Sequence, residues 1–159
     1  NNTTRIDPVP GAKCPCSNWG LPGRGCAHSV GPDGARLIAT GHPSLAGDTV
    51  VLTARGLSGP GLFFQGTAQM GGGFGIPFGD GILCAGGTIT RMGVVFPTGS
   101  GPSSEASYPG GLTPNLVHIA GGVGAPGTFH YQVWYRDANV YCTAQTYNLT
   151  QGLTIGWTP

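Results

Sequence analysis

The sequence predicts an all-β fold, an antiparallel β-sandwich of about eight strands, jelly-roll-like or immunoglobulin-like, with almost no helix. The first observation behind this prediction is turn density, since 31 glycines and 14 prolines occur in 159 residues. The second is alternation: in 128–136 and again in 153–158, every second side chain is apolar, as half-buried strands require. An apolar fraction of 39% supplies a core and argues against the disorder that so much glycine and proline can cause.

The elements follow in order from the turn residues between them. An N-terminal arm, residues 1–13, is polar and broken by prolines, so we expect it to be extended and able to lie against a sheet edge. Residues 14–34 form a cysteine-bearing loop with successive turns. The runs that favour strands are 35–40, 48–56, 61–69, 82–84, 87–96, 115–120, 127–136 and 152–158. Residues 97–114 are the longest predicted surface loop, and no segment has the period of a helix.

Size and charge set the domain organisation and exclude several partners. A chain of this length forms one domain around one core, which we assign to residues 14–159 behind the arm. The formal net charge is only +1, so neither nucleic acid nor an anionic membrane surface is an expected partner. No apolar stretch reaches the roughly 18 residues of a membrane span. The chain starts at Asn1 without Met, which suits a mature form whose export signal has been removed.

Five cysteines beside a single lysine favour disulfides and an oxidising compartment. Within the loop we prefer the pair Cys16–Cys26. Farther along the chain we prefer Cys84 with Cys142, both at strand ends, although the spacing leaves other connectivities open. Cys14 is then unpaired, or bonded to another chain or to an upstream residue. A zinc site is not expected, because CPC followed by one distant cysteine lacks the ligand spacing of such sites.

No pattern of catalytic or metal-ligating residues stands out. The histidines lack both HExxH and a pair four residues apart. His118 and His130 could face each other across neighbouring strands, but such a polar pair is commoner than a metal site. The acids are dispersed, although Asp80 or the Asp137 turn could contribute oxygens to a calcium site. GxSxG is absent and there is one glutamate, which argues against a serine hydrolase and a glycosidase. We therefore predict a non-catalytic protein without a metal or cofactor.

Two tryptophans offer the clearest candidates for a binding surface. Trp134 falls on the polar side of its predicted strand, and Trp19 lies in the cysteine-bearing loop. If exposed, both could stack on sugar rings. The alternative is that a second layer covers them and that both belong to the core, as is common in sandwiches.

Several runs of the sequence resemble a known family. They are CPCSNWGLPGRGCAHS, DTVVLTARGL, GLFFQGTAQ, FGDGILCAGG, YQVWYRD and YNLTQGLTIGWTP. In this order they resemble an uncharacterised glycine-rich module, often C-terminal, of large secreted proteins from planctomycete-type and related bacteria. The resemblance covers residues 14–159 and implies no particular reaction or ligand. Members often carry a further cysteine upstream of CPC, whereas residues 1–11 contain none here.

These observations favour a secreted, extracellular or cell-surface structural protein. The first hypothesis is a subunit that associates with copies of itself into a fibre or array, its arm adding as a strand to a neighbour. Thr4, Ile6 and Val9 are the positions expected to dock. The second hypothesis is a module for carbohydrate binding or adhesion, with extracellular glycans as partners.

Overall fold

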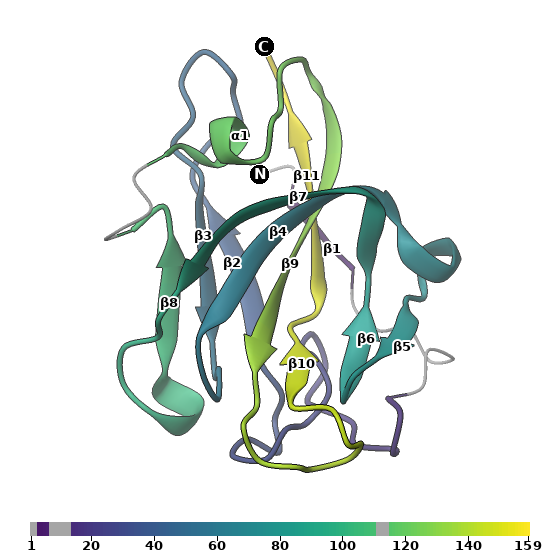
Figure 1. The fold of residues 1–159 in the computed structure, drawn as a ribbon. Helices are drawn as coiled ribbons and strands as arrows, with labels where there is room; N and C mark the ends of the chain where they lie inside the picture. Colours follow the sequence, from purple (N-terminus) through teal and green to yellow (C-terminus); the bar gives the residue numbers. More distant parts are fainter. Residues whose placement is uncertain (1–2, 7–13, 111–114) are drawn as a thin grey trace.

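The fold is an antiparallel β-sandwich, as the sequence predicts. The computed structural model describes residues 3–6, 14–110 and 115–159. The main sheet has the strand order β1-β11-β9-β4-β7, and β10 also pairs with β9. A second sheet has the order β2-β3-β8, and β5 and β6 form a separate hairpin. Figure 1 shows the second sheet on the left of the main sheet and the hairpin on the right.

The bounds of the elements are as follows. The strands are β1 (Thr3–Ile6), β2 (Arg36–Thr40), β3 (Val51–Arg55), β4 (Gly61–Gln69), β5 (Ile76–Phe78), β6 (Gly81–Leu83), β7 (Ala85–Val95), β8 (Glu105–Tyr108), β9 (Gly127–Arg136), β10 (Tyr147–Leu149) and β11 (Gly152–Trp157). The helical turns are η1 (Met70–Gly73), η2 (Gly101–Ser103) and α1 (Val117–Ala120).

The main core lies between the two larger sheets. Alternate residues of β9 face it, and Tyr131, Val133 and Tyr135 are each at most 1% exposed. They join side chains from β4 and β11 on the same sheet and from β2, β3 and β8 on the other. The alternation in 128–136 therefore identifies the buried face of β9 correctly, because side chains of a strand point to opposite faces in turn.

A smaller layer covers part of the outer face of the main sheet. The β5–β6 hairpin lies over Gln132, whose side chain is fully buried. Its amide nitrogen donates to the carbonyl oxygens of Ile82 and Thr150, at 2.8 and 2.7 Å. Its oxygen accepts from the backbone N–H groups of Cys84 and Ala85. A glutamine on the polar side of a strand thus holds the hairpin to the sheet, since buried amides need partners.

Most predicted strands are confirmed, and those at 61–69 and near 127–136 match β4 and β9 closely. The strand predicted at 115–120 is wrong, because α1 occupies 117–120 of that segment. A short apolar run cannot distinguish a strand from a helical turn by periodicity alone. The loop predicted at 97–114 contains β8, whose Ala106 and Tyr108 reach the core. The polar residues around β8 made this segment resemble a loop. The strands β5 and β10 were also not predicted.

Candidate functional site

The structure corrects the predicted disulfides. Cys14 bonds to Cys26, and Cys16 bonds to Cys142, so the preferred pairs Cys16–Cys26 and Cys84–Cys142 are wrong. Cys84 takes part in neither bond and lies buried, with its thiol 3.8 Å from the carbonyl oxygen of Ile82. Cys14, which the preferred pairs left without an intrachain disulfide, is therefore bonded within the chain.

The physical reason for the correction is burial. The CPC segment forms a turn in which the N–H of Ser17 donates to the carbonyl oxygen of Cys14. The side chains of the two cysteines then point in different directions. Cys14 points inward and clusters with Cys26, Cys84 and Ile82. Cys16 points outward, where it meets Cys142 on the loop that follows β9. Distance along the chain suggested Cys16 and Cys26, but the direction of each side chain decides which sulfurs can meet.

The predicted docking arm contributes a strand to the main sheet. Thr3–Ile6 pairs antiparallel with β11, with Thr4 opposite Thr154 and Ile6 opposite Gly152. Figure 1 shows β1 paired with β11 of the same chain. Val9 lies outside the described residues. Strand addition to a sheet edge is thus seen within the chain, and docking on a neighbouring copy stays a prediction.

The opposite edge of the main sheet is β7. This strand pairs with β4 along one side and ends the sheet order on the other. Ile89, Val94 and, just beyond the strand, Phe96 are 43%, 52% and 71% exposed. A long edge strand that exposes apolar side chains is a surface suited to pairing with another chain.

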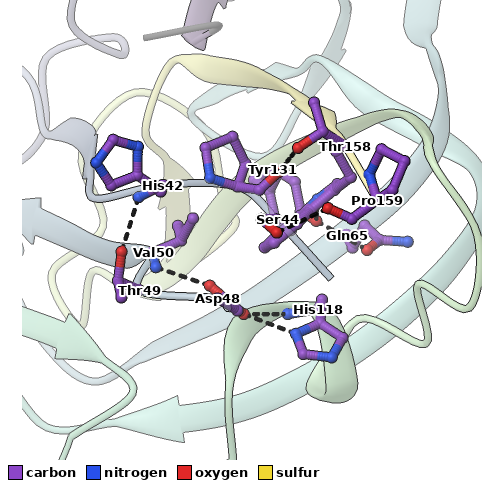
Figure 2. A network of polar contacts seen from close by, with 12 residues as sticks. His42, Ser44, Asp48, Thr49, Val50, Gln65, His118, Tyr131, Thr158 and Pro159 are labelled. Atoms are coloured by element: carbon purple, nitrogen blue, oxygen red, sulfur yellow. Dashed lines mark hydrogen bonds and ion pairs between the residues drawn. The ribbon is translucent and has the colours of Figure 1, made fainter. Parts of the chain in front are cut away.

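A buried acid–histidine pair links the β2–β3 loop to α1 (Figure 2). One carboxylate oxygen of Asp48 accepts from the backbone N–H of His118 at 3.0 Å and lies 2.9 Å from Nδ1 of its ring. The other oxygen accepts from the N–H of Val50 at 2.7 Å. The side chain of Asp48 is fully buried and that of His118 is 15% exposed. The carboxylate therefore fixes both the loop and the first turn of α1.

The same end of the core holds a second polar chain. The indole N–H of Trp157 donates to the hydroxyl of Tyr131 at 2.8 Å, and that hydroxyl donates to Gln65 at 3.1 Å. Burial holds the pKa of Tyr131 well above its ordinary value. The ring of His118 packs on Trp157 with centroids 5.8 Å apart. These groups are matched donors and acceptors, which is what a buried polar network requires.

The acid–histidine pair has one feature of catalytic triads, a carboxylate that orients an imidazole. A triad also needs a nucleophile hydrogen-bonded to the other ring nitrogen. Within the part of the chain that the structure describes, no serine, threonine or cysteine makes that bond. The bonds of Asp48 to the N–H groups of Val50 and His118 support a structural role in anchoring α1. Sequence reasoning missed Asp48, although the turn in which it bonds the N–H two residues on is a recognisable signal.

His118 and His130 do not face each other across neighbouring strands. His118 lies on α1, whereas His130 lies on β9 and its Nδ1 is 2.9 Å from the hydroxyl of Thr154. Residues Val117–Ala120 form α1, so the predicted strand at 115–120 does not pair with β9.

The acids considered for calcium have protein partners. Asp80 accepts from the N–H and the hydroxyl of Thr143, both at 2.7 Å. Asp137 accepts from the N–H and the hydroxyl of Ser29. Across residues 3–6, 14–110 and 115–159, no group of three histidine, cysteine or acidic side chains could hold a metal ion. Both aspartates anchor loops, the default role of aspartate in turns.

The two candidate tryptophans have different surroundings. Trp19 is 48% exposed on the cysteine-bearing loop, next to Leu21, which is 50% exposed. Trp134 is half-buried and packs on the small outer core. Its ring lies 6.0 Å from that of Phe78 and 5.3 Å from that of Tyr147, centroid to centroid. The β5–β6 hairpin thus covers Trp134 in part, and Trp19 is the more exposed of the two.

In the described residues, no helix has the length and apolar character of a membrane span. No family model, curated protein or solved structure matches this chain.

Proposed function

We propose that this chain is a non-catalytic extracellular building block that joins copies of itself through its sheet edges. In this proposal β1 leaves its own β11 and pairs with β11 of a neighbouring copy. The observation that carries the proposal is the position of β1, a separate N-terminal strand that completes the main sheet at one edge.

Exchange of β1 between copies requires no new chemistry. The backbone bonds that β1 makes to β11 are the same whether it comes from the same chain or from another. An exchanged strand therefore makes the same backbone bonds to β11 as in the closed molecule. The cost of exchange is the entropy lost when two chains associate. If each copy donates β1 to the next in one direction, the contact is heterologous and produces a ring or an open filament.

The two disulfides support an oxidising compartment. Secretion to the outside or the surface of a bacterial cell is part of the proposal. The resemblance to a module of secreted planctomycete-type proteins agrees with it.

The first test compares the intact chain with a variant lacking residues 1–13, by light scattering and electron microscopy. We expect concentration-dependent oligomers or filaments from the intact chain and monomers from the truncated one. A synthetic peptide of residues 1–13 should bind the truncated chain, because it can refill the empty edge of β11. Monomers from both chains at every concentration would overturn the proposal.

A cross-link distinguishes exchange from ordinary aggregation. Thr4 and Thr154 are opposite each other in the register, so the variant Thr4→Cys/Thr154→Cys can form a disulfide at this point. Exchange predicts covalent dimers or ladders on non-reducing gels, and each single substitution serves as the control. A disulfide confined to one chain, in a protein that stays monomeric, would argue against exchange.

A carbohydrate-binding or adhesion module is the alternative, and exposed Trp19 beside Leu21 favours it. Aromatic rings in solvent can stack on sugar rings. A glycan array probed with the intact protein and with Trp19→Ala tests the carbohydrate-binding hypothesis. Binding that the substitution abolishes would support it, and an array blank for all glycans would oppose it.

A further inference from the structure

A half-open apolar pocket lies on the outer face of the main sheet, between the sheet and the β5–β6 hairpin. Its volume is about 150 Å³. The lining residues are Leu62, Phe64, Phe78, Leu83, Ile89, Arg91, Trp134 and Leu149. An internal cavity of this size with aliphatic and phenyl walls holds one benzene molecule. The pocket therefore has room for a single six-membered ring.

The aromatic walls of the pocket are held in place. Trp134 meets Tyr147 edge to face, at an interplanar angle of 85°. The ring centroids of Phe78 and Tyr147 are 5.2 Å apart. Phe64 is 5% exposed and Leu149 is fully buried. Because these rings are already packed, a ligand would not have to order them, which removes one cost of binding. Edge-to-face contacts with Trp134 and Phe78 favour an aromatic ring over a saturated one.

One charged side chain belongs to the pocket. Arg91 lies opposite Phe64 in the β4–β7 ladder and lines the cavity. Among the described residues, its guanidinium forms no hydrogen bond and no ion pair. By contrast, Arg55 is paired with Glu105 at 2.8 Å. An unpaired guanidinium beside an apolar cavity complements a ligand that carries an anionic group on an apolar body.

We propose that this pocket binds a small aromatic carboxylate, with the ring between Trp134 and the β5–β6 hairpin and the carboxylate on Arg91. A sugar fits less well, because Arg91 and the indole N–H of Trp134 are the polar groups among the lining side chains. Most hydroxyls of a buried sugar would lack partners, which is costly. The site is independent of β1 and of the assembly proposed above.

The probe for this site is 3-phenylpropionate, titrated into the intact protein by calorimetry and followed by NMR. We expect saturable binding with a dissociation constant of about 1 mM or below, as suits a ligand this small. The indole N–H signal of Trp134 should shift, while that of Trp19 stays in place. The neutral analogue 3-phenylpropanol should bind more weakly, and so should 3-cyclohexylpropionate, which keeps the charge and lacks the aromatic ring.

Two variants separate the charge from the cavity. Arg91→Gln should weaken binding of 3-phenylpropionate about three- to tenfold and leave 3-phenylpropanol unaffected. Ile89→Trp should fill the pocket from its exposed wall and abolish binding of both probes. Arg136→Gln, a change at an exposed arginine of β9 that does not line the pocket, is the matched control and should bind as the unmodified protein does.

The proposal fails if 3-phenylpropionate does not bind at 10 mM, or if it binds equally well to Ile89→Trp. It also fails if Arg91→Gln leaves the affinity for 3-phenylpropionate unchanged. Tighter binding of glucuronate than of 3-phenylpropionate would assign the pocket to acidic sugars and overturn the aromatic assignment.

Discussion

At the scale of single residues, buried polar side chains govern how this protein responds to pH. His130 is 7% exposed on β9 and bonds to Thr154. His28 is 3% exposed and packs edge to face on Tyr135. Burial lowers the pKa of His130. Burial also lowers the pKa of His28, although the charge of Asp137 opposes part of that shift. Both rings are thus favoured in the neutral form when the protein is folded.

The consequence is a loss of stability at mildly acidic pH. The ordinary histidine pKa is 6.5, so as the pH falls below this value the unfolded chain takes up protons that the folded chain refuses. The free energy of unfolding should therefore decrease from pH 7 towards pH 5. Urea denaturation at a series of pH values measures this, and His130→Gln should give a shallower decrease. An equally steep profile in the variant would show that His130 does not contribute.

At the scale of elements, the pairing of β4 with β7 depends on close backbone approach. The register shifts between Gly66 and Ala68, as at a β-bulge. A side chain at Gly66 would overlap the carbonyl oxygen of Gly86 and lie 2.6 Å from its nitrogen. This glycine is therefore required by the spacing of two strands, and not by a turn.

Gly66→Ala should destabilise the protein by about 2 kcal/mol or more, because the added methyl group forces β4 and β7 apart. Gly124→Ala is the matched control, since a Cβ there meets no atom within 4 Å, and it should change stability by less than about 0.5 kcal/mol. Chemical denaturation of both variants measures the difference. Similar stabilities for the two would contradict the close approach seen between the strands.

At the scale of the whole molecule, the Cys16–Cys142 disulfide joins positions 126 residues apart. It ties the N-terminal loop to the loop after β9, where Val140 is 72% exposed. A cross-link that closes so long a loop stabilises mainly by restricting the unfolded chain. Its contribution should therefore be large although Cys16 itself is exposed.

Cys16→Ala/Cys142→Ala should lower the free energy of unfolding by about 5 kcal/mol, the value that loop-closure entropy predicts for a loop of this length. Val140→Ser, on the same loop, should cost less than about 0.5 kcal/mol because it is a surface change. Urea denaturation measures both, and peptide mapping under non-reducing conditions checks the connectivity. A loss below 1 kcal/mol in the double variant would mean that the unfolded chain is already compact at this point.

The sequence by itself determined the fold class, the strands β4 and β9 and the buried face of β9. These depend on local alternation and turn residues, which any short stretch of chain reveals. Tertiary structure decided what local pattern could not: the direction in which Cys14 and Cys16 point, and the helical turn at Val117–Ala120. It also decided the meeting of Asp48 with His118 and the layer that half-covers Trp134. Each of these depends on which distant segment lies alongside, and burial against that segment selects among conformations that the local sequence leaves nearly equal in energy.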